Sequence, residues 1–248
     1  LVGFRIPQAF LTRSLWERSN RLVGVLSFIN SINIILSSLL IKNAILVAYA
    51  IFSTMLIIGI ASIYTRRIVE LETGREIGGE KPIERLSIIR INPLIPIAGW
   101  IITFIIVFFM LIYRPGLKEI IAVHFDVEWR PNMFMSRDEF ITSFIVVIFG
   151  IMFALTAIMY SANGLPSLQG FEDYNKSIAM ILQAFSIFIP LFFSVVIIVI
   201  YTYNIVGSIQ QYVVIIFYSA IIACLGIVVY VIVKNRRICC LLYTSDAA

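Results

Sequence analysis

The stretch NAILVAYAIFSTMLIIGIASIYT, residues 43–65, contains no Asp, Glu, Lys, Arg or His and decides the class of the fold. A helix needs roughly 20 apolar residues to cross ~30 Å of hydrocarbon, and this stretch meets that length. The runs of this kind are 22–41, 43–65, 91–113, 140–160, 177–203 and 205–233. Transmembrane strands would be shorter and would alternate in polarity. The six continuous runs therefore predict six transmembrane helices.

The composition of the whole chain supports the same class. Of the 248 residues, 60% are hydrophobic and only 13% are charged, whereas about a quarter of a soluble domain is charged. There is too little polar material to cover a soluble globule of this size. The predicted fold is all-α: a polytopic membrane protein built as a bundle of six transmembrane helices.

The Lys and Arg residues are unevenly divided between the two sides of this topology. Fourteen of the 19 lie in the N-terminal arm, in the loop after the second run, after the fourth run and at the C-terminus. The positive-inside rule places that side, and both ends of the chain, in the cytoplasm of a cell-membrane protein. Acidic lipid headgroups can pair with these Lys and Arg residues, so the positive charge does not require nucleic acid. No direct nucleic-acid partner is predicted. The segment between the third and fourth runs is predicted to face outward.

This outward segment contains the stretch IAVHFDVEWRPNMFMSRDEF, residues 121–140, with the only histidine of the chain. Ser136 followed by Glu139 has the spacing of a capping box, so we expect Ser136 to start the fourth transmembrane helix. His124, Asp126 and Glu128 alternate, and an extended backbone would place all three on one face. Such a face is one arrangement for a divalent metal ion, although one His and two acids are a weak pattern.

We favour a recognition surface over a metal site for this segment. Its candidate ligand- or partner-binding residues are His124, Asp126, Trp129 and Phe134. No cofactor is expected. The apolar runs contain no ionisable residue, which argues against an intramembrane hydrolase and against an ion-coupled transporter. We therefore predict a protein without catalytic activity.

Polar residues also gather in the first run, as Ser27, Asn30, Ser31, Asn33, Ser37 and Ser38. At ~100° per residue they cover one helix face. This face suits a helix–helix interface, and the alternative is a cavity for a small ligand. Gly150 and Ala154 in the fourth run are spaced for close helix packing.

Two motifs resemble those of the SdpI family of immunity-type membrane proteins. In the N-terminal arm the matching residues are Gly3, Arg5, Pro7, Trp16, Asn20 and Arg21. The middle segment is similar to a domain of unknown function that accompanies the SdpI module, through His124, Asp126, Phe134, Ser136 and Arg137. Trp129 stands where that domain usually has Gly.

The resemblance implies a receptor-like membrane protein. The best-known member protects its producer from a secreted toxin and, when bound to toxin, holds a transcriptional repressor at the membrane. On this basis we expect an extracellular peptide or toxin and a cytoplasmic regulator as partners. The alternative is a small-molecule permease subunit or channel that uses the polar face of the first run.

The resemblance also suggests how the chain is organised. Residues 1–90 would form an SdpI-like arm with two transmembrane helices and a cytoplasmic loop, and residues 91–238 a four-helix membrane unit that carries the His-bearing loop. The first residue is Leu1, so we expect the chain to be a fragment. Residues 239–248 resemble a translated sequencing adaptor and are interpreted as a non-native tail.

Overall fold

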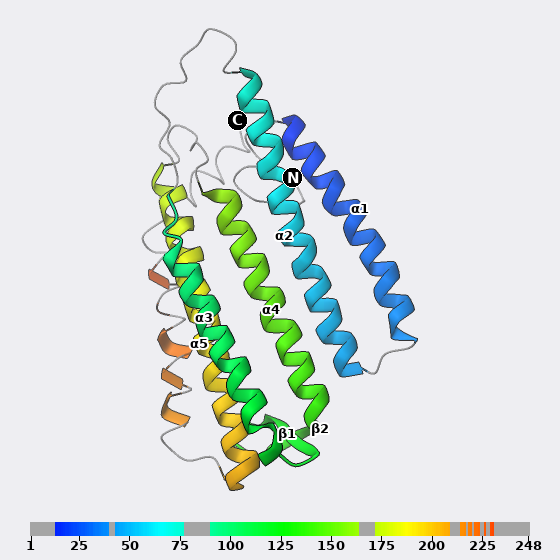
Figure 1. Cartoon of the computed structure of the whole chain (residues 1–248), viewed down its shortest axis with the longest axis vertical. Helices are drawn as coiled ribbons and strands as arrows, with labels where there is room; N and C mark the ends of the chain where they lie inside the picture. The colour runs from blue at the N-terminus through cyan, green and yellow to red at the C-terminus, as the bar shows by residue number, and fades with distance from the viewer. Residues whose placement is uncertain are drawn as a thin grey trace. The chain divides into compact units, whose positions relative to one another are not determined.

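A computed structural model describes residues 13–39, 43–76, 90–163 and 172–208, and short pieces between 214 and 230. The elements along the chain are α1 (Arg13–Ser38), α2 (Asn43–Glu76), α3 (Leu94–Tyr113), the 3-10 turn η2 (Arg114–Gly116), β1 (Ile120–Phe125), β2 (Pro131–Ser136), α4 (Arg137–Ala162) and α5 (Glu172–Val206) (Figure 1). Gly3, Arg5 and Pro7 of the N-terminal motif lie outside the described residues, as does the tail 239–248.

Five helices are long and apolar enough to cross a membrane, and each coincides with one of the predicted runs. Their spans are Trp16–Ser38, Ile45–Val69, Leu94–Gly116, Arg137–Ala162 and Ala179–Val206. The sixth predicted span, 205–233, falls mostly on residues that are not described; its described part includes a shorter apolar helix, Val214–Ala223. The multi-pass helical character is thus confirmed, and the count of six stays a prediction.

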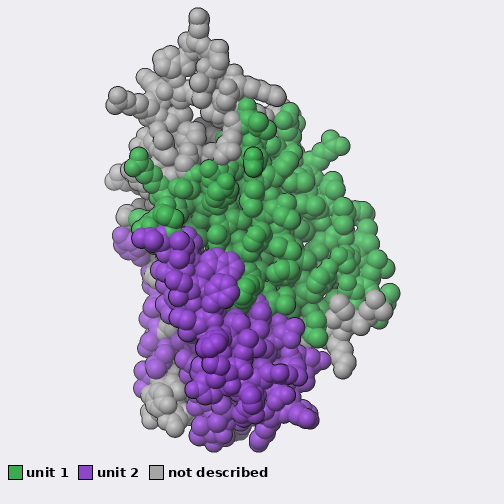
Figure 2. Space-filling view, viewed as in Figure 1, with its two compact units in different colours: residues 1–93, 146–183 green, residues 94–145, 184–248 purple. Residues whose placement is uncertain are grey.

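Contacts divide the chain into two compact units (Figure 2). Unit 1 comprises residues 1–93 and 146–183, and unit 2 comprises residues 94–145 and 184–248. In unit 1, α1 packs along α2, and a hydrogen bond between the hydroxyls of Ser19 and Thr65 (3.0 Å) joins the start of α1 to the end of the span in α2. Both hydroxyls are fully buried.

Two glycines bring α2 and α4 close together in unit 1. A Cβ atom on Gly59 would lie 2.4 Å from the ring of Phe153, and one on Gly150 would lie 2.9 Å from the ring and 3.2 Å from the Cα of Phe52. Each helix thus places a phenylalanine over a glycine of the other. Ala154 is also buried. The prediction that Gly150 and Ala154 serve helix packing is confirmed.

In unit 2, aromatic residues join α5 to α3 and to the first turns of α4. The Tyr201 hydroxyl donates a hydrogen bond to the Met110 carbonyl (2.9 Å), and both side chains are buried. The rings of Phe109 and Tyr201 lie 5.5 Å apart, and the rings of Phe144 and Phe193 meet edge to face at 5.4 Å. Aromatic pairs of this geometry add about 0.5–1.5 kcal/mol to the burial of their area.

The segment between α3 and α4 adds a small β-sheet to the helical fold, a feature that the sequence analysis did not predict. β1 and β2 pair as an antiparallel hairpin, with Ile121 opposite Met135 and Ala122 opposite Phe134. The β-branched residues of IIAVHF favour an extended strand, and the RPG turn before it ends the preceding helix. Ile121 is completely buried, so this short sheet is packed against its unit rather than extended into solvent.

Candidate recognition hairpin

The loop of the hairpin is organised by Asp126. The backbone N–H of Trp129 donates to the Asp126 carbonyl (3.0 Å), and the Asp126 N–H donates to the Arg130 carbonyl (2.9 Å). The Asp126 Oδ1 accepts two further hydrogen bonds, from the N–H groups of Glu128 (2.9 Å) and Arg130 (2.8 Å). An aspartate that binds the backbone two residues on is a standard way to stabilise a turn. Asp126 therefore builds the loop, a role that the sequence interpretation as a binding residue did not include.

Trp129 closes the loop in a backbone conformation that normally belongs to glycine. Its φ is +62°, the only positive φ among the described non-glycine residues. A three-residue hairpin loop commonly ends with a residue in this left-handed region, and the conformation costs a residue with a Cβ roughly 1–2 kcal/mol. The tight turn expected at this position is thus present here with Trp instead of Gly. The Trp129 ring lies edge-on to Tyr218 at 6.0 Å.

The side chain of His124 in β1 contacts a side chain of β2. His124 Nδ1 and Asn132 Oδ1 are 2.6 Å apart, and both residues are exposed. The pairing is irregular here: register shifts fall between Ala122 and His124 and between His124 and Phe125. These irregularities let His124 reach Asn132 across the hairpin. The imidazole therefore has a hydrogen-bonding role at the surface of the sheet.

The side chain of Asn204 in α5 forms hydrogen bonds with the backbone of strand β1. The Asn204 Oδ1 accepts from the Ala122 N–H (2.8 Å), and the Asn204 Nδ2 donates to the Ala122 carbonyl (2.9 Å) and to the Ile200 carbonyl (2.8 Å). One amide thus satisfies both outward backbone groups of Ala122, as a third strand would. Ala122 is only 1% exposed, so these groups would otherwise be buried without partners.

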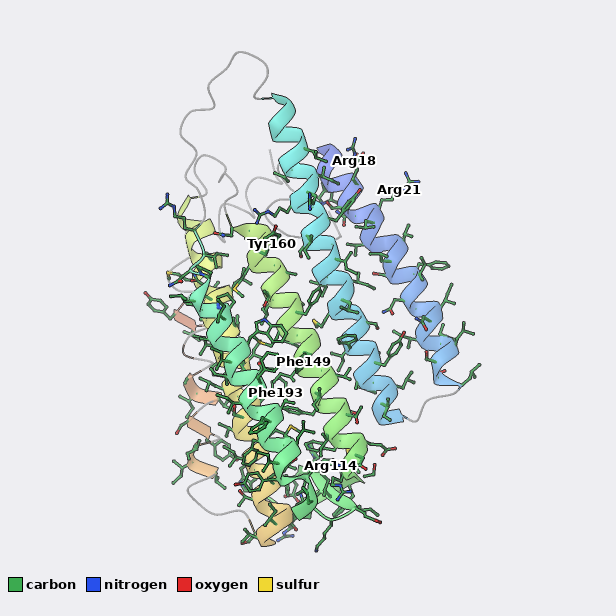
Figure 3. All side chains as sticks on the ribbon, viewed as in Figure 1. Arg18, Arg21, Arg114, Phe149, Tyr160 and Phe193 are labelled. Carbon is green, nitrogen blue, oxygen red and sulfur yellow. The ribbon has the colours of Figure 1, made fainter. Side chains whose placement is uncertain are left out.

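The junctions with α3 and α4 anchor the other side of the hairpin. The Ser136 hydroxyl accepts from the Glu139 N–H (3.3 Å), so Ser136 caps α4 as predicted. Asp138 pairs with Arg114 through two contacts of 3.0 Å and with Arg137 at 3.1 Å. Arg114 is labelled beside the hairpin in Figure 3. These exposed pairs add little stability individually, but they fix where β2 enters α4.

The hairpin presents apolar side chains that its own fold does not cover. Val127 at the loop is 91% exposed, Phe134 59% and Met133 53%. Of the predicted binding residues, His124 and Phe134 are exposed, whereas Asp126 and Trp129 are partly buried. His124, Asp126 and Glu128 do not share one strand face, because β1 ends at Phe125. Among the described residues no three His, Cys, Asp or Glu side chains gather as metal ligands.

The described part of the N-terminal motif lies on the first turns of α1. The Asn20 Nδ2 donates to the Trp16 carbonyl (2.9 Å), one helical turn away, and Arg21 is exposed. This part of α1 lies toward the same end of unit 1 as the end of α4, where Arg18, Arg21 and Tyr160 are labelled (Figure 3).

Further contacts gather basic residues at this end of unit 1. The Arg66 guanidinium donates to the Tyr160 carbonyl and lies over the Tyr160 ring, 4.2 Å from its centroid. The Ile91 N–H donates to Asn163 Oδ1 (3.0 Å), which brings the start of the next segment, and Arg90 with it, to the end of α4. Basic residues near a helix C-terminus complement its dipole.

No protein-family model, curated protein or solved structure matches the chain. The fold itself defines the class: a multi-pass helical protein with helices long and apolar enough for a membrane, and with an ordered β-hairpin between two of them. The resemblance to the SdpI family rests on the quoted motifs alone and stays a prediction.

Proposed function

We propose that the chain is a multi-pass cell-membrane protein of SdpI-like immunity or signalling type, which binds an extracellular peptide or toxin through the β1–β2 hairpin and catalyses no reaction. The observation that carries the proposal is an anchored hairpin with uncovered apolar side chains. Val127, Met133 and Phe134 are more than half exposed, while the Asp126 turn and the Asn204 amide hold the backbone in place. A preordered apolar surface loses little conformational entropy on binding.

The orientation belongs to the proposal. In unit 1, Arg18, Arg21, Arg66 and Arg90 gather at one end, and the positive-inside rule favours the cytoplasm for that end. The hairpin follows α3, one span further along the chain, and would then face outward. The basic end would meet acidic lipid and a cytoplasmic regulator.

Orientation is tested by cysteine labelling in a background whose native cysteines are serine. Val127→Cys should react with a membrane-impermeant thiol reagent in intact cells, and Gly78→Cys, in the loop after the second predicted span, should not. The reverse pattern would overturn the orientation, and the proposed external ligand with it.

Binding is tested by placing a photoreactive benzophenone amino acid at Val127. Intact cells that carry this variant are exposed to culture medium from bacterial strains that secrete peptide toxins. We expect one discrete peptide adduct, strongly reduced by Phe134→Ala or Trp129→Ala and unchanged by Arg21→Gln, an exposed residue of α1 outside the hairpin. His124→Gln should be milder than His124→Ala, because an amide can still bond to Asn132. Absence of any adduct, or an adduct indifferent to all hairpin variants, would refute the proposal.

The permease alternative depended on the polar face of the first run. In α1 the hydroxyls of Ser31 and Ser38 donate to the carbonyls of Ser27 (2.8 Å) and Ile35 (2.6 Å), and the Ser37 hydroxyl donates to Asn33 (3.3 Å). These hydroxyls satisfy their hydrogen bonds within their own helix. The geometry gives this face no specific support as a ligand site.

A further inference from the structure

A groove of about 390 Å³ lies between the hairpin and the end of α5. Its hairpin wall includes Ile120, Ala122 and Phe134; the last two are opposite each other in the register and so share a face of the sheet. Its second wall is residues 203–207, and Lys118 also lines the groove. All these residues belong to unit 2.

The groove has a positive charge that its own residues do not neutralise. Lys118 is the only charged residue among the described residues that line it. Lys118 is exposed and has no carboxylate partner within the described ranges, whereas nearby Asp138 is paired with Arg114 and Glu128 with Arg130 (2.8 Å). An ammonium beside apolar walls favours an anionic group that also carries an apolar part.

The second wall offers hydrogen-bond acceptors. The last four carbonyls of a helix have no donor within it. In α5 the Tyr203 carbonyl accepts from the Gly207 N–H (2.7 Å), and Gly207 turns the chain away with a φ of +83°. Within the described residues, the carbonyls of Asn204, Ile205 and Val206 receive no comparable donor. A ligand that brings N–H groups would satisfy them.

We propose that this groove binds the C-terminal end of the external peptide, an inference that rests on the proposed function. The terminal carboxylate pairs with the Lys118 ammonium, backbone N–H groups donate to the carbonyls of the last turn of α5, and the last side chain, an apolar one, packs against Ile120 and Phe134. A C-terminal residue suits the groove because it carries a carboxylate and an apolar side chain together. An Asp or Glu residue within a peptide could supply the negative charge only through its side chain, and would then have no apolar side chain for the walls of the groove.

A lipid headgroup is the competing occupant. A phosphate would also pair with Lys118, but it offers no N–H donor for the carbonyls at the end of α5. The geometry therefore favours the peptide. Ethanolamine lipids do carry N–H donors, so the experiment includes them.

The test uses the full chain in nanodiscs of phosphatidylcholine, with a benzophenone amino acid in place of Phe134. The probes are two fluorescent hexapeptide libraries that end in Leu, Ile, Val or Phe, one with free carboxylates and one with carboxamides. We expect at least about tenfold more labelling by the carboxylate library, since a charge-assisted hydrogen bond is worth more than 1.4 kcal/mol. Lys118→Gln should remove the difference and Lys118→Arg should retain it. Arg130→Gln, a cation of the same hairpin that does not line the groove, is the matched control.

Equal labelling by the two libraries would overturn the groove assignment. So would loss of the labelling when phosphatidylglycerol or phosphatidylethanolamine is added to the nanodiscs, because the site would then be a lipid site. The two proposals can fail separately. If the benzophenone at Val127 gives adducts in cells but labelling at position 134 does not depend on the carboxylate, the hairpin remains the binding element. The peptide would then contact a part of the hairpin outside the groove. No adduct from either position would refute both.

Discussion

Replacing Asn204 by Leu should loosen the hairpin far more than the loss of one surface amide would suggest. Leu has nearly the same size but cannot bond to Ala122, whose N–H and carbonyl both depend on the Asn204 amide. Ala122 is 1% exposed, so the variant leaves two buried backbone groups without partners. Each such group costs about 1–3 kcal/mol. Because Asn204 is only partly buried, water should recover some of this, and we expect a net loss of about 2–4 kcal/mol.

The assay is hydrogen exchange of the β1 amides, followed by mass spectrometry or NMR in nanodiscs. A loss of this size corresponds to an acceleration of about 30- to 900-fold for the Ala122 amide. Asn204→Asp should give an intermediate result, because it keeps the acceptor for the N–H and places a second oxygen against the carbonyls of Ala122 and Ile200. Asn132→Leu, which removes an exposed amide of the same hairpin, is the control and should leave the Ala122 amide protected.

One result would refute this reasoning directly. If Ala122 exchanged within about threefold of the wild-type rate in Asn204→Leu, at unchanged membrane levels, the amide would not be what closes the outer edge of β1. A large effect in Asn132→Leu as well would show that the hairpin responds to any change in its polar groups.

Three further predictions concern stability, each measured as the thermal midpoint of the purified protein. Trp129→Gly should be about 1 kcal/mol more stable than Trp129→Ala, because both lose the ring and only Gly is relieved of the left-handed strain; equal midpoints would exclude that strain. Ser136→Ala should cost about 1 kcal/mol and Ser136→Asp should restore most of it, since Asp also caps helices; if Asp fails, the hydroxyl does more than cap. Gly150→Ala should cost about 1–3 kcal/mol, because the new Cβ meets the Phe52 backbone as well as its ring, whereas Gly24→Ala, with open space at its Cβ, should be neutral or stabilising; similar behaviour of the two would contradict the close packing of α2 and α4.

The helices were predictable because the signal is local and large. A run of 20 or more uncharged, mostly apolar residues has few ways to satisfy its backbone in a membrane other than as a helix, and five such runs are helical spans here. The cap at Ser136 was predictable for the same reason, since the motif and its hydrogen bond lie within four residues. Helix ends were less accurate: α5 runs from Glu172 to Val206, beyond both ends of the predicted run 177–203.

The hairpin was missed although part of its signal is in the sequence. IIAVHF is rich in β-branched residues, and Pro115 and Pro131 bound the region. The turn, however, lacks the glycine that usually marks it, because Trp129 occupies the left-handed position. The contacts that place the hairpin are not local: Asn204 is 82 residues from Ala122. The groove at Lys118 depends on the same contact and could not be found from spacing.

The two attachments of the hairpin differ in kind, and this difference has a mechanical consequence. β2 runs into α4 without a linker, because Ser136 is both the last residue of the strand and the cap of the helix. β1 has no covalent connection to α5 and is held to it by the hydrogen bonds of the Asn204 amide and by the edge-to-face contact of the Phe125 and Tyr203 rings at 4.9 Å. A strand of six residues is about 20 Å long, so a tilt of about 10° at the start of α4 would displace the loop by about 3–4 Å. Such a displacement would stretch these non-covalent contacts and leave the β2–α4 junction intact, so Asn204 and the Phe125–Tyr203 ring pair together resist a bound partner that pulls the hairpin away from α5.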